Sequence, residues 1–258
     1  MLEPGPGETP LWSSVRITGL FSPDAEFDAL QRALCAEFAL DDMPAHRIEE
    51  LADRPWEREW LKDFRPMRFG SRLWVCPRGQ QPDGDGLDSA IRLELDPGLA
   101  FGTGTHPTTA LCLRWLDQQH GRGLLQDARV FDFGCGSGIL AIAALLLGAN
   151  RAVAMDIDPQ AVTATLTNAA QNGVDENLSA STVRPDDEFD LVFANILAAP
   201  LIDNAEWLCE RLSDGAWLLL SGILINQVDD IRDAYGRWID FEPPEFDDDW
   251  ARLAGRKR

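Results

Sequence analysis

The sequence is poor in the residues that build metal sites and disulfide frameworks. It has three histidines and five cysteines. The cysteines are scattered and odd in number, and no two have the two-residue gap typical of zinc or redox motifs. The histidines are equally far apart. We therefore expect reduced cysteines and no bound metal.

Long apolar runs are also missing. No run reaches the roughly 18 residues that a membrane-spanning helix requires. The first ten residues contain Gly, Pro and Glu where a secretion signal would have a charged start and an apolar stretch. We expect a cytoplasmic protein that has no membrane segment.

Basic residues are scarce as well. The chain has 23 Lys and Arg against 43 Asp and Glu, which gives a formal net charge of −20. Such a chain repels the backbones of nucleic acids and is attracted to basic surfaces. We therefore expect no direct binding of nucleic acid. A basic protein substrate and solubility alone explain the charge equally well.

The 258 residues are enough for one large α/β domain or for a small domain before a core domain. Up to residue 51 the sequence predicts a β-α-β piece, with strands at Val15–Phe21 and His46–Leu51 around a helix at Phe27–Phe38. We place a domain boundary near residues 55–65. The predicted parts are a small domain at 1–55, a linker helix with connecting strands at 56–90, and the main domain at 91–258. Within the linker and just beyond it we predict a helix at Trp56–Phe64, strands at Arg72–Cys76 and Ile91–Leu95, and a loop at Arg78–Gly86.

From residue 108 onward, apolar strands alternate with helices. This pattern predicts a parallel sheet covered on both faces. The predicted strands are Arg129–Phe133, Ala152–Asp156, Leu191–Ala194 and Trp217–Ser221. The predicted helices are Thr108–Gln118, Ile139–Leu147, Pro159–Asn172, Leu201–Leu212 and Asn226–Tyr235. Two further segments, Ile239–Glu242 and Trp250–Ala254, end the chain.

The segment from Asp132 to Gly138 joins a buried strand to a helix. Its alternate glycines, Gly134, Gly136 and Gly138, let a ligand approach the backbone, and the helix start offers unpaired N–H groups. Open α/β sheets bind ligands at such turns. A dinucleotide site would have Gly-x-Gly-x-x-Gly to hold a pyrophosphate. We therefore predict S-adenosylmethionine, with Asp132 near its ammonium and the glycine amides facing its carboxylate or ribose; a purely structural loop is the alternative.

A second acid, Asp156, ends the next predicted strand. A carboxylate at that position can accept hydrogen bonds from both hydroxyls of a ribose. Asp158 follows it, near the expected edge of the adenine. Together with Asp132 and the glycine turn, these acids favour a nucleoside site over a structural loop.

Asn195 follows the strand Leu191–Ala194, again at a carboxyl end. Its amide oxygen can accept a hydrogen bond from an incoming amine, and methyl transfer to nitrogen depends mainly on positioning a neutral lone pair. The alternative is that Asn195 caps the next helix.

The stretch Phe101–Thr109 reads Phe-Gly-Thr-Gly-Thr-His-Pro-Thr-Thr and brings hydroxyls and amides together, as a cover over a polar ligand would require. A phosphate loop is the competing interpretation, but the lysine of such a loop is missing.

These motifs resemble the ribosomal protein L11 methyltransferase (PrmA) family. The resemblance covers nearly the whole chain. The matching segments are Trp56–Trp60, Leu95–Ala100, Phe101–Thr109, Asp132–Gly138, Asp156–Ala161, Asn195–Ala198 and Gly255–Lys257.

The resemblance implies an α/β fold: a seven-stranded, Rossmann-like class I methyltransferase domain preceded by a ferredoxin-like α+β domain that recognises the substrate. It implies cofactor contacts at Thr109, Gly134, Asp156 and Asn195, to which we add Ile157 and the other residues of the glycine turn. Family members methylate lysine and N-terminal amines of ribosomal protein L11. A monomer that binds this basic protein is therefore expected.

For the amine we expect positioning by Asn195, Thr105 and His106, with no strong general base. Two other functions remain open. The chain could be a methyltransferase for another protein amine or a small amine, or a cofactor-binding module without catalysis.

One departure from the family lies at the N-terminus. Family members usually carry a further strand, helix and strand before the position that Met1 holds here. In a ferredoxin-like domain the first strand lies between the two strands predicted at Val15–Phe21 and His46–Leu51, and without it those strands have unpaired edges. We therefore expect a truncated small domain that is mobile, repacked or completed by another chain. Cofactor binding should survive, because its motifs lie beyond residue 95.

Overall fold

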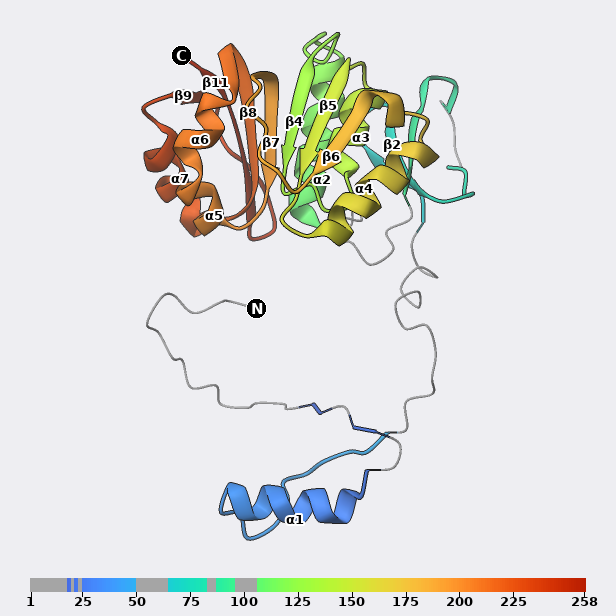
Figure 1. The fold of residues 1–258 in the computed structure, drawn as a ribbon, viewed down its shortest axis with the longest axis vertical. Helices are drawn as coiled ribbons and strands as arrows, with labels where there is room; N and C mark the ends of the chain where they lie inside the picture. The colour runs from blue at the N-terminus through green and yellow to red at the C-terminus, as the bar shows by residue number, and fades with distance from the viewer. Residues whose placement is uncertain (1–17, 20, 23–24, 50–64, 83–86, 96–105) are drawn as a thin grey trace. The chain divides into compact units, whose positions relative to one another are not determined.

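The computed structural model describes residues 18–19, 21–22, 25–49, 65–82, 87–95 and 106–258 (Figure 1). The chain divides into two compact units, residues 1–54 and residues 55–258.

The first unit contains the predicted helix, α1 (Phe27–Glu37). The prediction of a strand at His46–Leu51 is wrong for residues 46–49, which the structure describes and which form no strand. There the His46 ring bonds to Pro44 O at 2.9 Å and to Gln31 Nε2 at 2.8 Å, so the segment is attached to α1 through a side chain. The predicted strand Val15–Phe21 falls mostly, and the helix Trp56–Phe64 wholly, outside the described residues.

The second unit is built on a mixed sheet in the order β10-β11-β8-β7-β4-β5-β6, with β9 also paired to β11. Neighbours among β4 to β8 pair in parallel, whereas β11 runs antiparallel to β8, β9 and β10. The strands are β4 (Arg129–Phe133), β5 (Arg151–Met155), β6 (Leu178–Ser181), β7 (Phe189–Asn195), β8 (Leu212–Leu224), β9 (Ile239–Phe241), β10 (Glu245–Asp247) and β11 (Trp250–Lys257).

Among the described residues this sheet therefore has eight strands, one more than predicted. The extra strand arises at the end of the chain. There β10 pairs with the first part of β11, residues 250–252, and β9 pairs with its last part, residues 255–257. The sequence indicated neither β10 nor β6. Both are short strands with mostly exposed or half-buried side chains, so they lack the continuous apolar run by which buried parallel strands are recognised.

Helices cover both faces of the sheet, as predicted (Figure 1). One face carries α2 (Pro107–His120), α3 (Ile139–Leu146) and α4 (Pro159–Gln171), and the other α5 (Ala198–Asp203), α6 (Ala205–Glu210) and α7 (Val228–Tyr235). The single helix predicted at Leu201–Leu212 is two helices, because the chain breaks at Asn204, whose Nδ2 donates to Pro200 O at 2.8 Å. The helix predicted from Asn226 begins as the 3-10 turn η4 (Ile225–Gln227) before α7. Within the described residues, no helix is long and apolar enough to cross a bilayer.

A second sheet lies against the α2–α3–α4 layer, on the side away from the main sheet (Figure 1). It contains β1 (Met67–Phe69), β2 (Leu73–Pro77) and β3 (Ile91–Leu95) in that order, with the 3-10 turn η2 (Leu87–Ser89) before β3. Because α3 lies between two sheets, its residues from Ile139 to Leu145 are all buried. Two predicted strands, Arg72–Cys76 and Ile91–Leu95, are thus confirmed, and they share one hydrophobic core with the main sheet.

Two polar side chains join this second sheet to the helices. Asp117 of α2 accepts hydrogen bonds from the amides of Ser71, Arg72 and Leu73 at 2.6–2.9 Å, and from the Ser71 hydroxyl at 2.9 Å. Burial by itself would raise the pKa of Asp117, but these hydrogen bonds outweigh it and hold the pKa below its ordinary value. Asn172, after α4, accepts from the amide of Glu94 and donates to its carbonyl.

Candidate functional site

The predicted glycine turn lies at the carboxyl end of β4. Gly134, Gly136 and Gly138 have φ angles of +77°, +54° and +77°, in the left-handed region that favours glycine. The amides of Gly134 and Cys135 donate to Met155 O at 2.8 and 3.0 Å, which folds the turn against the end of β5. A Cβ at Gly138 would lie 2.7 Å from Thr165 Cγ2. At Gly138 the turn therefore packs closely against α4 and accepts no side chain.

Asp156 braces this turn from the end of β5. Its Oδ2 accepts from the Gly136 amide at 3.0 Å and its Oδ1 from the Asp158 amide at 3.0 Å. Asp158 in turn caps α4, since its Oδ1 accepts from the Gln160 amide at 2.8 Å. The carboxylate of Asp156 is thus fixed in orientation beside the glycine turn, where two sugar hydroxyls can reach its oxygens.

Asp132 lies beneath the turn and is buried, with 1% of its surface exposed. Its Oδ2 accepts from the Ala141 amide at 3.1 Å, in the first turn of α3. Burial raises the pKa of this carboxyl to about 7, and the nearby charge of Asp156 adds to the effect. Asp132 therefore also serves as a cap for α3. A contact with a ligand ammonium remains a prediction.

Asn195 lies at the end of β7 and contacts the first turn of α2. Its Nδ2 donates to Thr109 Oγ1 at 3.1 Å. The alternative role as a helix cap is wrong, because α5 begins after Leu197 and no side chain caps it. The amide nitrogen is used by Thr109, so the amide oxygen is the atom that can accept from an incoming amine.

His106 is the N-cap residue of α2. Its Nδ1 bonds to Thr108 Oγ1 at 2.8 Å and accepts from the Thr108 amide at 3.4 Å. Its ring meets Trp250 edge to face, with the centroids 4.9 Å apart. The structure thus gives His106 a structural role and brings Trp250, which the sequence did not indicate, beside the motif. Thr105 lies outside the described residues.

Exposed apolar side chains gather at the same edge of the sheet. Ile157, Val183 and Leu197 follow β5, β6 and β7 and are 87%, 72% and 62% exposed. Isolated exposed apolar residues are common, but these three come from successive strand ends. Ile157 directly follows Asp156 and supplies apolar surface beside that residue, as a flat heterocycle attached to a sugar would require.

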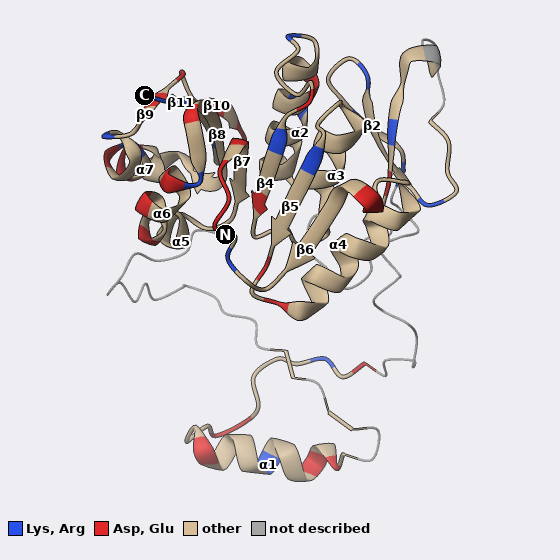
Figure 2. Ribbon diagram, turned by 45° about the horizontal axis from the view of Figure 1, so that its top comes forward, with Lys and Arg blue, Asp and Glu red and all other residues tan. Residues whose placement is uncertain are grey.

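Charge is also polarised along the central strands. Arg129 and Arg151 open β4 and β5 as register partners, whereas Asp132 and Asp156 lie at the opposite ends (Figure 2). Asp156 therefore places a carboxylate at the carboxyl edge, which favours a ligand that carries positive charge, such as a sulfonium, an ammonium or an amine.

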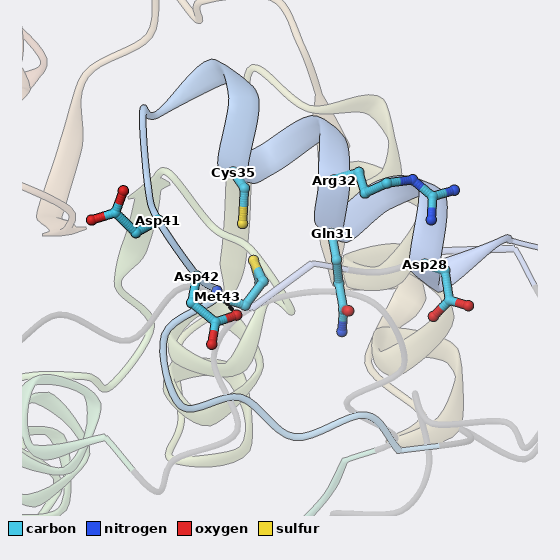
Figure 3. Close-up of a pocket in the computed structure, with 7 residues that line it drawn as sticks. All are labelled: Asp28, Gln31, Arg32, Cys35, Asp41, Asp42 and Met43. Atoms are coloured by element: carbon cyan, nitrogen blue, oxygen red, sulfur yellow. Dashed lines mark hydrogen bonds between the residues drawn. The ribbon is translucent and has the colours of Figure 1, made fainter.

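A separate hollow of about 340 Å³ lies in the first unit, between α1 and residues 41–43 (Figure 3). Among its lining side chains are Asp28, Asp41 and Asp42 with the single cation Arg32. It contains none of the predicted site residues. In the described parts of the chain, no three His, Cys, Asp or Glu side chains are grouped as metal ligands would be.

Known relatives match the chain over its whole length. The ribosomal protein L11 methyltransferase of Alkalilimnicola ehrlichii is 51% identical over 261 residues, covering 100% of this chain and 86% of the relative. That of Alteromonas mediterranea is 48% identical over 262 residues, covering 100% and 87%.

A solved structure agrees with these sequence matches. The ribosomal protein L11 methylase from Lactobacillus delbrueckii subsp. bulgaricus has a TM-score of 0.67 and 32% identity, covering 76% of this chain and 100% of that one. The profile of the family "Ribosomal protein L11 methyltransferase (PrmA)" matches residues 1–258. The chain therefore belongs to the ribosomal protein L11 methyltransferase (PrmA) family.

Proposed function

We propose that this protein transfers methyl groups from S-adenosylmethionine to lysine and N-terminal amines of ribosomal protein L11, in the cytoplasm. Family membership supports the reaction class and the substrate. One structural observation carries the site: a fixed carboxylate, Asp156, lies beside the glycine turn at the carboxyl edge of the sheet.

The residues present fit S-adenosylmethionine, which supplies a methyl group on a positively charged sulfur. The Asp156 carboxylate is oriented to accept from the ribose hydroxyls, and the exposed side chain of Ile157 offers apolar surface for the adenine. The positive φ angles of Gly134, Gly136 and Gly138 shape the turn at the carboxyl end of β4, where we place the methionine moiety. We place Asp132 near the ammonium of that moiety, as a carboxylate that also caps α3.

The acceptor amine is proposed to meet Asn195. The amide oxygen of Asn195 would accept from the amine and direct its lone pair, while Thr109 fixes the amide from the other side. We propose that Thr109 and Asn195 both contact the cofactor as well. A lysine must first lose a proton, since its ordinary pKa is about 10.4. We assign this step to solvent or a nearby carboxylate, and assign positioning to Asn195, Thr105 and His106.

We further propose a division of labour along the chain. Residues 1–55, a ferredoxin-like domain, recognise the substrate, residues 56–90 connect, and residues 91–258 bind the cofactor. The separation of residues 1–54 as a compact unit supports the first of these boundaries, whereas β1 and β2 share the hydrophobic core of the main sheet. A net charge of −20 favours a monomer that binds the basic ribosomal protein and makes no direct contact with nucleic acid.

The test is mass spectrometry of purified ribosomal protein L11 after incubation with this protein and S-adenosylmethionine. Mass increments of one or more methyl groups on lysine or N-terminal amines are expected, and none with Asn195→Ala in the same time. Methyl transfer only to another amine would support a different acceptor. Binding of the cofactor without transfer to any amine would support a non-catalytic module.

A further inference from the structure

Strand β8 contains a β-bulge next to the candidate site. In its pairing with β11, Ala251 lies opposite Ile223 and Leu253 lies opposite Leu220, so two residues of β8 face the single residue between them. Those two residues are Ser221 and Gly222, and Gly222 has a φ angle of +83°. Bulges bend a strand and redirect its side chains, and they are frequent beside active sites.

The bulge lies against the segment that carries Asn195. Asn195 pairs in register with Ser221, and the next residue, Ile196, packs its backbone on Gly222. A Cβ at Gly222 would overlap the carbonyl oxygen of Ile196 and lie 2.7 Å from its carbonyl carbon and 3.0 Å from its nitrogen. Because all three atoms are backbone, no change of side-chain rotamer could relieve the overlap. Only glycine at 222 allows Ile196 its present place.

The same bulge also holds the start of α2. Ser221 is fully buried, and its hydroxyl lies 3.2 Å from Thr108 O and 3.3 Å from Ala251 O. Thr108 precedes Thr109, the residue whose hydroxyl accepts from Asn195. Both halves of the Asn195–Thr109 pair are therefore attached to the two residues of one bulge.

We propose that Ser221 and Gly222 are positioning residues for methyl transfer: the bulge sets the orientation of Asn195 and Thr109 and thereby the alignment of the acceptor amine. This inference rests on the proposed function and deepens it. Neither residue needs to touch the amine or the cofactor, since each acts through a neighbour. A shift of about 1 Å in such a support costs on the order of 100-fold in rate.

Gly222→Ala tests the proposal, with Gly215→Ala as the matched control. Gly215 lies on the same strand with a φ angle of +73°, but a Cβ there would meet only Arg256 Nη2 at 3.6 Å. Both variants carry the cost of a left-handed alanine, and only Gly222→Ala must displace Ile196. The measurements are kcat on ribosomal protein L11, the dissociation constant of S-adenosylmethionine by calorimetry, and the thermal midpoint.

We expect Gly222→Ala to lower kcat about 100-fold relative to Gly215→Ala, with the cofactor dissociation constant changed at least ten times less than kcat. Equal kcat in the two variants would overturn the proposal. So would a loss of cofactor affinity as large as the loss of kcat, because the bulge would then support the whole site.

If Gly222→Ala does not fold, Ser221→Ala decides. It removes the hydroxyl near Thr108 O and adds no atoms. The proposal requires at least a fivefold loss of kcat with cofactor affinity retained, and unchanged kcat rejects it. Failure of the proposed function would give a different result. In that case the wild-type protein would bind the cofactor but methylate no amine of the ribosomal protein.

Discussion

The buried carboxyl of Asp132 makes stability depend on pH in a way that one substitution can isolate. The pKa of this group is raised from 3.8 to about 7 in the folded protein, mainly by burial. Between these values the unfolded chain carries the charge and the folded protein holds the proton. The free energy of unfolding therefore falls as the pH rises, because the unfolded chain releases the proton that the buried Asp132 carboxyl keeps in the folded protein. Asp132→Asn cannot ionise and should not show this fall.

The size of the effect follows from the two pKa values. Each pH unit between them costs about 1.4 kcal/mol, so the penalty is about 2 kcal/mol at pH 5 and about 4 kcal/mol at pH 8. The unfolding free energy of Asp132→Asn relative to wild type should therefore improve by about 2 to 3 kcal/mol between these pH values. A constant offset from the buried amide of the asparagine cancels in this comparison.

The assay is urea unfolding of both proteins at pH 5 and pH 8, followed by circular dichroism. Asp214→Asn, at an exposed position on β8, controls for removal of one negative charge. A difference between wild type and Asp132→Asn that stays within about 0.5 kcal/mol across the pH range would refute the reasoning. It would show that the Asp132 carboxylate is ionised at little cost in the folded protein.

Three further predictions concern single side chains. Asp156→Ala should weaken S-adenosylmethionine binding about 10- to 100-fold by calorimetry, because it removes a charged acceptor that also braces Gly136; unchanged affinity would exclude the ribose contact. Asn195→Ala should lower kcat about 100-fold in the methylation assay, and near-normal turnover would remove Asn195 from the mechanism. Asp117→Ala should destabilise the fold by about 3 kcal/mol in urea unfolding, because amides of the β1–β2 turn lose their acceptor; a loss below about 0.5 kcal/mol would contradict this.

Much of the main domain could be predicted from periodicity. The bounds of β4 and β3 agree with the prediction, and α2, α3 and α4 agree to within two residues at either end, because buried parallel strands and capped helices leave strong local patterns. Features that depend on distant partners could not be predicted. The strands β1 and β10 are three residues long, and the break at Asn204 rests on a hydrogen bond between side chain and backbone.

The candidate site shows the same division. The motif residues meet in two pairs, Asp156 with Gly136 and Asn195 with Thr109, and their roles toward a ligand stay predictions. No local pattern indicated that Asp132 caps α3 or that Trp250 contacts His106. The roles of Ser221 and Gly222 were hidden too. A bulge is a mismatch in register between two strands, so it cannot be predicted from the sequence of either strand alone.

Helix α2 is secured near both of its ends by bonds to separate parts of the fold. Ser221 and Asn195 hold its first turn, while Asp117, in its last turn, is bound by three consecutive amides of the outer sheet. Because of these contacts, α2 can neither slide nor tilt without breaking several hydrogen bonds at once. Under the proposed function, amines of different size and surroundings must therefore be accommodated by movement of the substrate chain, because α2 stays in place.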